Sequence, residues 1–170
     1  MGGDTGAPGP DGGWLAAGVP RLQPGDVACW VVKSSLPLDR VSPGWAAGQP
    51  RELDRCLRPS YRLELMAPGQ PCLLWVSGRD RPGVHALGVL AAVPVGSVEG
   101  PVVAVRLARL AEPVDRGELL ADPAVRDAEV LRMPAGSNPS WLTAGQYAAL
   151  LDHVGTARPL PGQGWDHGVS

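Results

Sequence analysis

The chain has 170 residues, which is enough for one domain of ordinary size and too few for two domains with separate cores. Its net charge of −2 argues against a strongly basic nucleic-acid clamp, and no apolar run approaches the roughly 20 residues needed to cross a bilayer. Three cysteines without CxxC or CxC spacing argue against a disulfide framework and a zinc ribbon. The first residues lack the pattern of a secretory signal, and this absence predicts a cytoplasmic protein.

Glycine and proline, 23 and 19 residues, are concentrated near the two ends of the chain. Their distribution predicts a flexible leader over residues 1–24, a folded domain over residues 25–154 and a flexible tail over residues 155–170. Residues 21–81 carry nine basic and six acidic side chains, so the first half of the domain has a charge of +3. This surplus permits a modest cationic face on a protein that is acidic overall.

The first half of the domain begins with an apolar, β-rich run at residues 27–34, which predicts a buried strand. Residues 35–62 are polar and interrupted by proline, which predicts loops with one or two short helices. There Arg51, Arg55 and Arg58 have helical spacing, and Pro59 ends such a helix before Arg62. Residues 71–78 and 84–93 predict a β-hairpin, in which Gly88 indicates a bulge or the close approach of another backbone.

The second half predicts a half-exposed strand over residues 102–110, a short helix and turn over 115–126, and a further strand over 128–133. A helix follows over residues 143–154. There Thr143 is a suitable N-cap and Gln146 completes a capping box. Together these elements predict an α+β fold: a small β-barrel of about five to six mostly antiparallel strands with two or three short helices packed on it.

Motifs for nucleotide hydrolysis, dinucleotide binding, nucleophilic catalysis and metal binding are absent from the sequence, so its residues do not support an enzymatic activity, and no cofactor or metal is expected. Its six tryptophans stand beside two tyrosines and no phenylalanine. Trp30 and Trp75 lie in the middle of predicted strands, where they either fill the core or line a pocket. Trp45 lies in a predicted loop, where it can stack on a flat ligand.

Several motifs occur in order along the domain: WVVKS at residues 30–34, Pro37, Trp45, the turn at 66–69, LLWVSG at 73–78, GVHALGVLAAV at 83–93 and RMPAGSNPSWLT at 132–143. In this order they resemble the EVE domain, a member of the PUA-like superfamily related to the YTH domain. The resemblance covers about residues 26–154. It implies a PUA-like barrel and a non-catalytic module that recognises a modified nucleobase, a methylated or otherwise modified cytosine or adenine in DNA or RNA, by extruding it into an aromatic pocket.

The resemblance also implies a set of site residues. The base-binding pocket would comprise Trp30, Lys33, Ser34, Ser35, Trp45, Trp75, Ser77, Gly78 and Asn138. The phosphate backbone would be held by Arg51, Arg55, Arg58, Arg62, Arg79 and Arg81. The expected partner is nucleic acid carrying a modified base, with a separate nuclease or restriction component as a possible second partner. The acidic balance of the chain keeps one alternative open, a small-molecule or nucleoside sensor that uses the same pocket.

Overall fold

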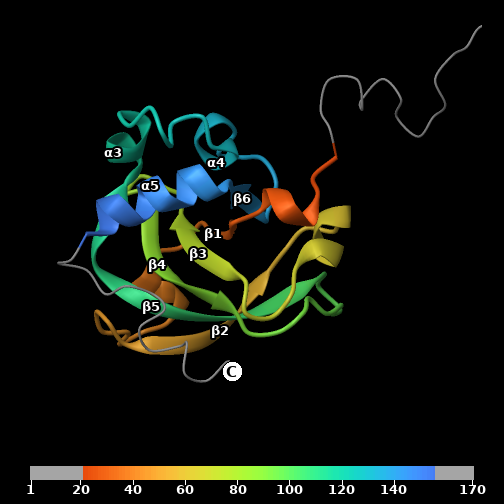
Figure 1. The fold of residues 1–170 in the computed structure, drawn as a ribbon. Coiled ribbons are helices and arrows are strands. Elements are labelled where there is room, and N and C mark those ends of the chain that lie inside the picture. The colour runs from red at the N-terminus through yellow and green to blue at the C-terminus, as the bar shows by residue number, and fades with distance from the viewer. Residues whose placement is uncertain (1–20, 156–170) are drawn as a thin grey trace, which may run out of the picture.

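The structure, a computed structural model, describes residues 21–155 (Figure 1). Of the predicted leader only residues 21–24 are described, and Leu22 among them is buried in the core. The remainder of the leader and the predicted tail from residue 156 lie outside the described residues. The elements in chain order are η1 (Pro24–Asp26), β1 (Cys29–Ser34), α2 (Leu38–Val41), β2 (Pro50–Cys56), η2 (Tyr61–Leu65), β3 (Pro71–Val76), β4 (Gly83–Leu90), β5 (Val102–Asp115), α3 (Arg116–Leu120), α4 (Glu129–Arg132), β6 (Ser140–Leu142) and α5 (Ala144–Val154).

The six strands form one sheet in the order β2-β5-β4-β3-β1-β6. Every neighbouring pair is antiparallel except β1 and β3, which run parallel because the long connection between them carries α2, β2 and η2. The predicted α+β class, the hairpin of β3 with β4 and the mostly antiparallel pairing are therefore confirmed. Among the described residues the edge strands β2 and β6 are not paired with each other, so the structure does not show the predicted small barrel to be closed.

The sheet separates two apolar clusters. One contains Val31 and Trp75 and is covered by α3, α4 and α5, which lie over one face of the sheet in Figure 1. The other contains Trp30 and Val32 and lies on the opposite face, toward η1, α2 and η2. Because successive residues of a strand point to opposite faces, β1 supplies both clusters. The alternation explains why a nearly continuous apolar run marks this strand in the sequence.

Two predicted elements are wrong in type. The expected helix through Arg51 and Arg55 is strand β2, which pairs with β5 over its whole length and alternates between exposed and half-buried side chains. The expected strand at residues 128–133 contains the short helix α4, whose Val130 and Leu131 are buried against the first cluster. Both segments are short, and short apolar or polar runs do not separate helix from strand until a partner is present.

Two local predictions are confirmed. Thr143 caps α5 by accepting a hydrogen bond from the Gln146 amide at 3.1 Å, and the Gln146 side chain accepts the Thr143 amide at 2.9 Å. Gly88 lies opposite Leu107 of β5, so closely that a Cβ atom at this position would be 1.9 Å from the Arg106 carbonyl oxygen. The thiols of Cys29 and Cys72 are also buried.

The last turn of α5 is held to α3 and the following loop by His153. Its Nδ1 lies 2.7 Å from Glu118 and its Nε2 lies 2.7 Å from Asp122. Burial lowers the pKa of this imidazole, but the bonds to Asp122 and Glu118 outweigh burial and hold the pKa above its ordinary 6.5. The position at a helix C-terminus adds to the preference for the charged form.

A raised pKa in the folded state makes the His153 contacts stabilising below the unfolded pKa, and this stabilisation is lost as pH rises through the folded pKa. We therefore expect His153→Gln to lower the melting temperature by about 4 °C at pH 5.5, and by less at pH 8.5. Thermal melts at both pH values measure the difference. The variant Glu118→Gln/Asp122→Asn should show the same loss of pH dependence, and a deficit of His153→Gln that stays constant with pH would contradict the assignment.

Candidate nucleic-acid interface

A pocket of about 390 Å³ lies where four segments that are far apart in the sequence meet. We call it the cationic pocket. These segments are the end of β1 with the turn after it, the end of β2, the residue after β3, and the loop before β6. Its lining residues are Lys33, Ser34, Ser35, Leu36, Arg55, Cys56, Arg58, Ser77, Pro134, Ala135, Gly136 and Asn138. Seven of these residues belong to the set that the sequence resemblance implies, and the volume lies in the range of small-ligand sites.

Three cations, Lys33, Arg55 and Arg58, line the pocket without any carboxylate among its lining residues. Burial lowers the pKa of both Lys33 and Arg55. The Lys33 ammonium donates a hydrogen bond to the Pro134 carbonyl at 3.2 Å, whereas the Nε of Arg55 is buried and has no hydrogen-bond partner in the described part of the chain. A buried donor without a partner has lost its hydrogen bonds to water, which costs free energy. A ligand that accepts a hydrogen bond from Arg55 would remove this cost, and the recovered free energy would add to its affinity.

Asn138 links β1 to the end of β2 at this pocket. Its Oδ1 accepts a hydrogen bond from the Lys33 amide at 3.2 Å, and its Nδ2 donates to the Cys56 carbonyl at 3.1 Å. Its own carbonyl accepts from the Arg58 amide at 2.9 Å. These partners fix which end of the side-chain amide is oxygen and leave one donor and one acceptor site of the amide unused. Asn138 therefore positions the pocket wall and keeps some capacity to contact a ligand.

Two of the serines at the pocket, Ser34 and Ser77, form hydrogen bonds with backbone atoms. The Ser34 hydroxyl is buried and bonds to both the amide and the carbonyl of Leu36, which shapes the turn after β1. Ser77 holds the neighbouring strand end through its amide, 2.8 Å from the Ser34 carbonyl. Ser35 is exposed at the rim. Gly78 stands beside it with a φ of +137°, a backbone conformation that favours glycine.

None of the three tryptophans assigned to the pocket lines it. Trp30 and Trp75 are fully buried on opposite faces of the sheet. Trp45 was assigned to the pocket wall from its place in a predicted loop, but its side chain is only 2% exposed, belongs to the second cluster and donates its indole N–H to the Gln49 carbonyl at 2.6 Å. With no phenylalanine in the chain, tryptophan takes the core volume that another aromatic residue would fill.

The remaining predicted arginines are dispersed. Arg51 donates to Ser42, Pro43 and Gly44 and so holds the loop before β2. Arg81 pairs with Asp115 and Glu112 on the surface, and Arg79 is exposed. These three residues lie outside the lining of the cationic pocket.

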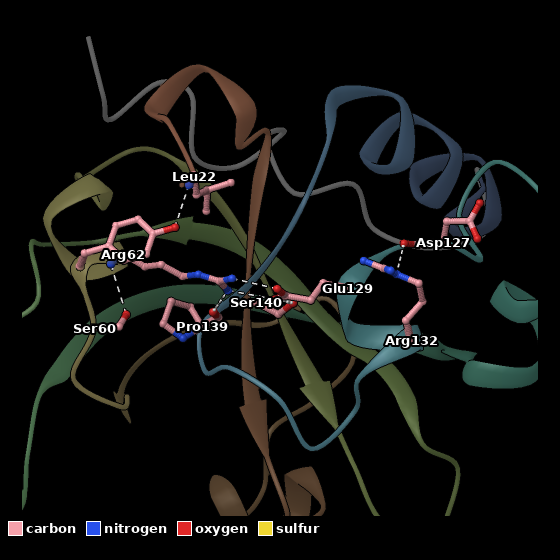
Figure 2. Close-up of polar contacts among 9 residues, drawn as sticks. Leu22, Ser60, Arg62, Asp127, Glu129, Arg132, Pro139 and Ser140 are labelled. Carbon is pink, nitrogen blue, oxygen red and sulfur yellow. Dashed lines mark hydrogen bonds and ion pairs between the residues drawn. The ribbon is translucent and has the colours of Figure 1, made fainter. Parts of the chain in front are cut away.

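Arg62 forms a two-pronged ion pair with Glu129 of α4 at 2.9 and 2.8 Å (Figure 2). It also donates to the Pro139 carbonyl at 2.9 Å, while the Ser140 hydroxyl donates to Glu129 at 2.7 Å. Burial raises the pKa of Glu129, but the hydrogen bonds from Arg62 and Ser140 outweigh it, so the pKa lies below its ordinary value. Because Pro139 follows Asn138, this ion pair supports the loop that walls the cationic pocket.

Cys56 was not among the residues predicted for the pocket. This thiol is exposed and lines the pocket between Arg55 and Arg58, whereas Cys29 and Cys72 are buried. In the sequence, the feature that could have identified Cys56 as a pocket residue is its position between Arg55 and Arg58, both assigned to phosphate binding.

Residues 21–155 contain no helix with the length and apolar character needed to span a membrane. Within the same range there is also no group of three or more histidine, cysteine, aspartate or glutamate side chains placed to hold a metal ion. The cationic pocket combines charge, concavity and a buried polar atom without a partner, the Nε of Arg55.

No protein-family model matches the sequence, and no curated protein matches it. Solved structures do match the fold. A hypothetical protein from Leishmania major superposes with a TM-score of 0.60 at 17% identity, covering 78% of this chain and 97% of that one. Protein PSPTO5229 from Pseudomonas syringae gives 0.56 at 17% identity, covering 75% and 99%. Human THYN1, solved in complex with 5-methylcytosine-containing DNA, gives 0.50 at 13% identity, covering 75% and 98%. The chain therefore has the fold of the EVE and PUA-like domains.

Proposed function

We propose that this chain is a non-catalytic module that binds nucleic acid and accommodates one extruded, modified nucleobase in the cationic pocket. One observation carries the proposal: Lys33, Arg55 and Arg58 converge in a concave site without a carboxylate, and Arg55 keeps a buried donor unpaired. Phosphate oxygens are the acceptors that such a set of cations prefers. The likeness to THYN1, solved with 5-methylcytosine-containing DNA, supports modified DNA as the partner.

Different residues of the pocket are proposed to contact the phosphates and the base, according to where their side chains lie. Lys33, Arg55 and Arg58 hold the phosphates next to the extruded nucleotide. The free donor and acceptor of Asn138, fixed in place by its backbone partners, face a base edge. Extrusion costs a few kcal/mol of lost stacking, which the phosphate contacts and the base contacts together offset. Methylated or otherwise modified cytosine or adenine is the proposed base.

A second candidate function is a nucleoside sensor that uses the same pocket. The observation that favours it is the net charge of −2, which repels long nucleic acid outside the immediate pocket. The two functions differ in salt dependence. A nucleic-acid reader releases counterions and weakens as salt rises, whereas a sensor of uncharged nucleosides does not.

The proposed function predicts that Arg55→Gln weakens the binding of single-stranded DNA containing 5-methylcytosine about tenfold and reduces the salt slope by about one. Fluorescence anisotropy of a labelled oligonucleotide at several salt concentrations measures both effects. The matched control is Arg40→Gln, which removes the same charge from an exposed position in α2 that lies outside the pocket lining. Equal affinities of Arg55→Gln and the wild-type protein would overturn the assignment of this pocket.

Cys56 provides a direct readout of occupancy in the same experiment. It is the exposed cysteine among Cys29, Cys56 and Cys72, so a maleimide labels it selectively. Bound oligonucleotide should slow this labelling severalfold, more strongly when the DNA carries the preferred modification. Slowing by a free modified nucleoside, independent of salt and without further gain from longer strands, would instead establish the sensor.

A further inference from the structure

A second and larger cavity, of about 600 Å³, lies next to the first. We call it the second pocket. It is enclosed by η1, η2, α4, β6 and the first turns of α5. Its lining residues are Arg21, Leu22, Asp26, Tyr61, Arg62, Asp127, Glu129, Arg132, Trp141 and Gln146, of which only Arg62 was assigned to a site in the sequence analysis. The Arg62–Glu129 ion pair borders it, and the same glutamate interacts electrostatically with Lys33 of the cationic pocket.

Two half-buried aromatic side chains, Tyr61 and Trp141, give the second pocket a flat apolar surface. The Tyr61 hydroxyl accepts a hydrogen bond from the Leu22 amide at 2.7 Å, which fixes the ring (Figure 2), and the Arg21 guanidinium lies 4.0 Å from the ring centre. No hydrogen bond engages the indole N–H of Trp141 within residues 21–155. Such a surface suits the face of a planar ring.

Arg132 is the cation of the second pocket that retains free donors. Its Nε donates to the Asp127 carbonyl at 3.0 Å, and its two terminal amino groups have no partner in the described range. In Figure 2 the Asp127 carboxylate points away from the Arg62–Glu129 pair, and its carbonyl faces Arg132. The charge of Glu129 is already neutralised by Arg62. A guanidinium with two free amino groups in one plane matches the geometry of a phosphate.

We propose that the second pocket binds a nucleotide, with its base stacked on Trp141 and its phosphate on the terminal amino groups of Arg132. The nucleotide has two possible sources with the same chemistry, a free mononucleotide or the neighbouring nucleotide of a strand held in the cationic pocket. Only the second source rests on the proposed function. The three arginines of the lining are balanced by Asp26, Asp127 and Glu129, so it is the two free terminal amino groups of Arg132 that favour the phosphate group. Trp141 and Tyr61 favour the base.

Isothermal titration calorimetry with adenosine and cytidine monophosphates, and with an unmodified eight-nucleotide single-stranded DNA, tests the inference. We expect Arg132→Gln and Trp141→Leu each to weaken at least one of these probes tenfold or more. The matched control, Arg126→Gln, removes an exposed arginine of the same chain segment that lines neither pocket. Melting temperatures of all variants establish that they are folded, and Arg132→Gln changes only an exposed side chain.

The outcomes separate the two sources and the two pockets. Loss of mononucleotide binding in Arg132→Gln identifies a free nucleotide, and loss of oligonucleotide binding alone identifies a strand. Unchanged binding of every probe by folded Arg132→Gln overturns the second pocket while leaving the cationic pocket untouched. Conversely, if Arg55→Gln keeps full affinity for oligonucleotides and Arg132→Gln loses the mononucleotides, the proposed function fails and the second pocket stands.

Discussion

Replacing Gly88 with alanine is expected to lower the free energy of unfolding by about 3 kcal/mol or more. An added Cβ atom would lie 1.9 Å from the Arg106 carbonyl oxygen and 2.9 Å from the Leu107 Cα atom. Both atoms belong to the backbone of β5, which pairs with β4 in the middle of the sheet. No side chain can rotate away to relieve this contact, so the two strands must separate locally.

Urea denaturation of Gly88→Ala and the wild-type protein measures the effect. Gly96→Ala is the matched control, since a Cβ atom there meets nothing within 4 Å and the backbone has no unusual φ. This control should be as stable as the wild-type protein. If Gly88→Ala unfolds at the same urea concentration as Gly96→Ala, the close approach of β4 and β5 is not as described.

The second large effect is expected at Arg62, whose replacement by methionine should cost about 2–3 kcal/mol of stability. Fully buried ion pairs cost about 3–5 kcal/mol when one partner is removed. Here the side chains of Arg62 and Glu129 are 13% and 18% exposed, so water screens part of the loss. The variant leaves the Glu129 carboxylate with the Ser140 hydroxyl as its donor and without a counter-charge, and it removes the donor of the Pro139 carbonyl, which also loosens the loop that carries Asn138.

Arg58→Met is the matched control for this experiment. Arg58 is exposed, and its side chain has no hydrogen-bond or ion-pair partner in the described part of the chain. We expect this control to retain its stability and to lose affinity for nucleic acid, since Arg58 lines the cationic pocket. Equal stability of the two variants would contradict the structural role of Arg62.

The stability deficit of Arg62→Met also depends on pH in a defined direction. The pKa of Glu129 is depressed in the folded protein, so the ion pair stabilises above the ordinary pKa of 4.5, and this contribution is lost as pH falls through the lower folded pKa. The difference between Arg62→Met and the wild-type protein should therefore be full at pH 7 and shrink toward pH 3. Denaturation at both pH values measures this change.

Local sequence patterns predicted the elements whose structure depends on interactions between residues close together in the chain. The apolar run of β1, the β3–β4 hairpin and the capping box of α5 each depend on neighbouring residues, and all three are confirmed. The requirement for glycine at position 88 was also visible in the sequence, because a glycine inside an apolar strand indicates a close neighbour. The ordered motifs between Lys33 and Asn138 marked segments that meet at one pocket.

The tertiary structure decided what depends on a distant partner. The segment with Arg51 and Arg55 has helical spacing, yet seven consecutive pairings with β5 make it a strand. Trp45 lies in a loop, yet the apolar cluster around it buries the ring. Arg62 is a cation near a proposed phosphate site, yet Glu129, which lies 67 residues further along the chain, takes up its donors.

By itself, then, the sequence determined the fold class, the strands with strong local patterns and most of the residues that gather at the cationic pocket. Only the tertiary structure determined which of these side chains remain available to a ligand. The physical reason is that an arginine or tryptophan has the same chemistry in any sequence window. Whether it faces solvent, fills a core or pairs with a carboxylate depends on contacts between segments far apart in the chain.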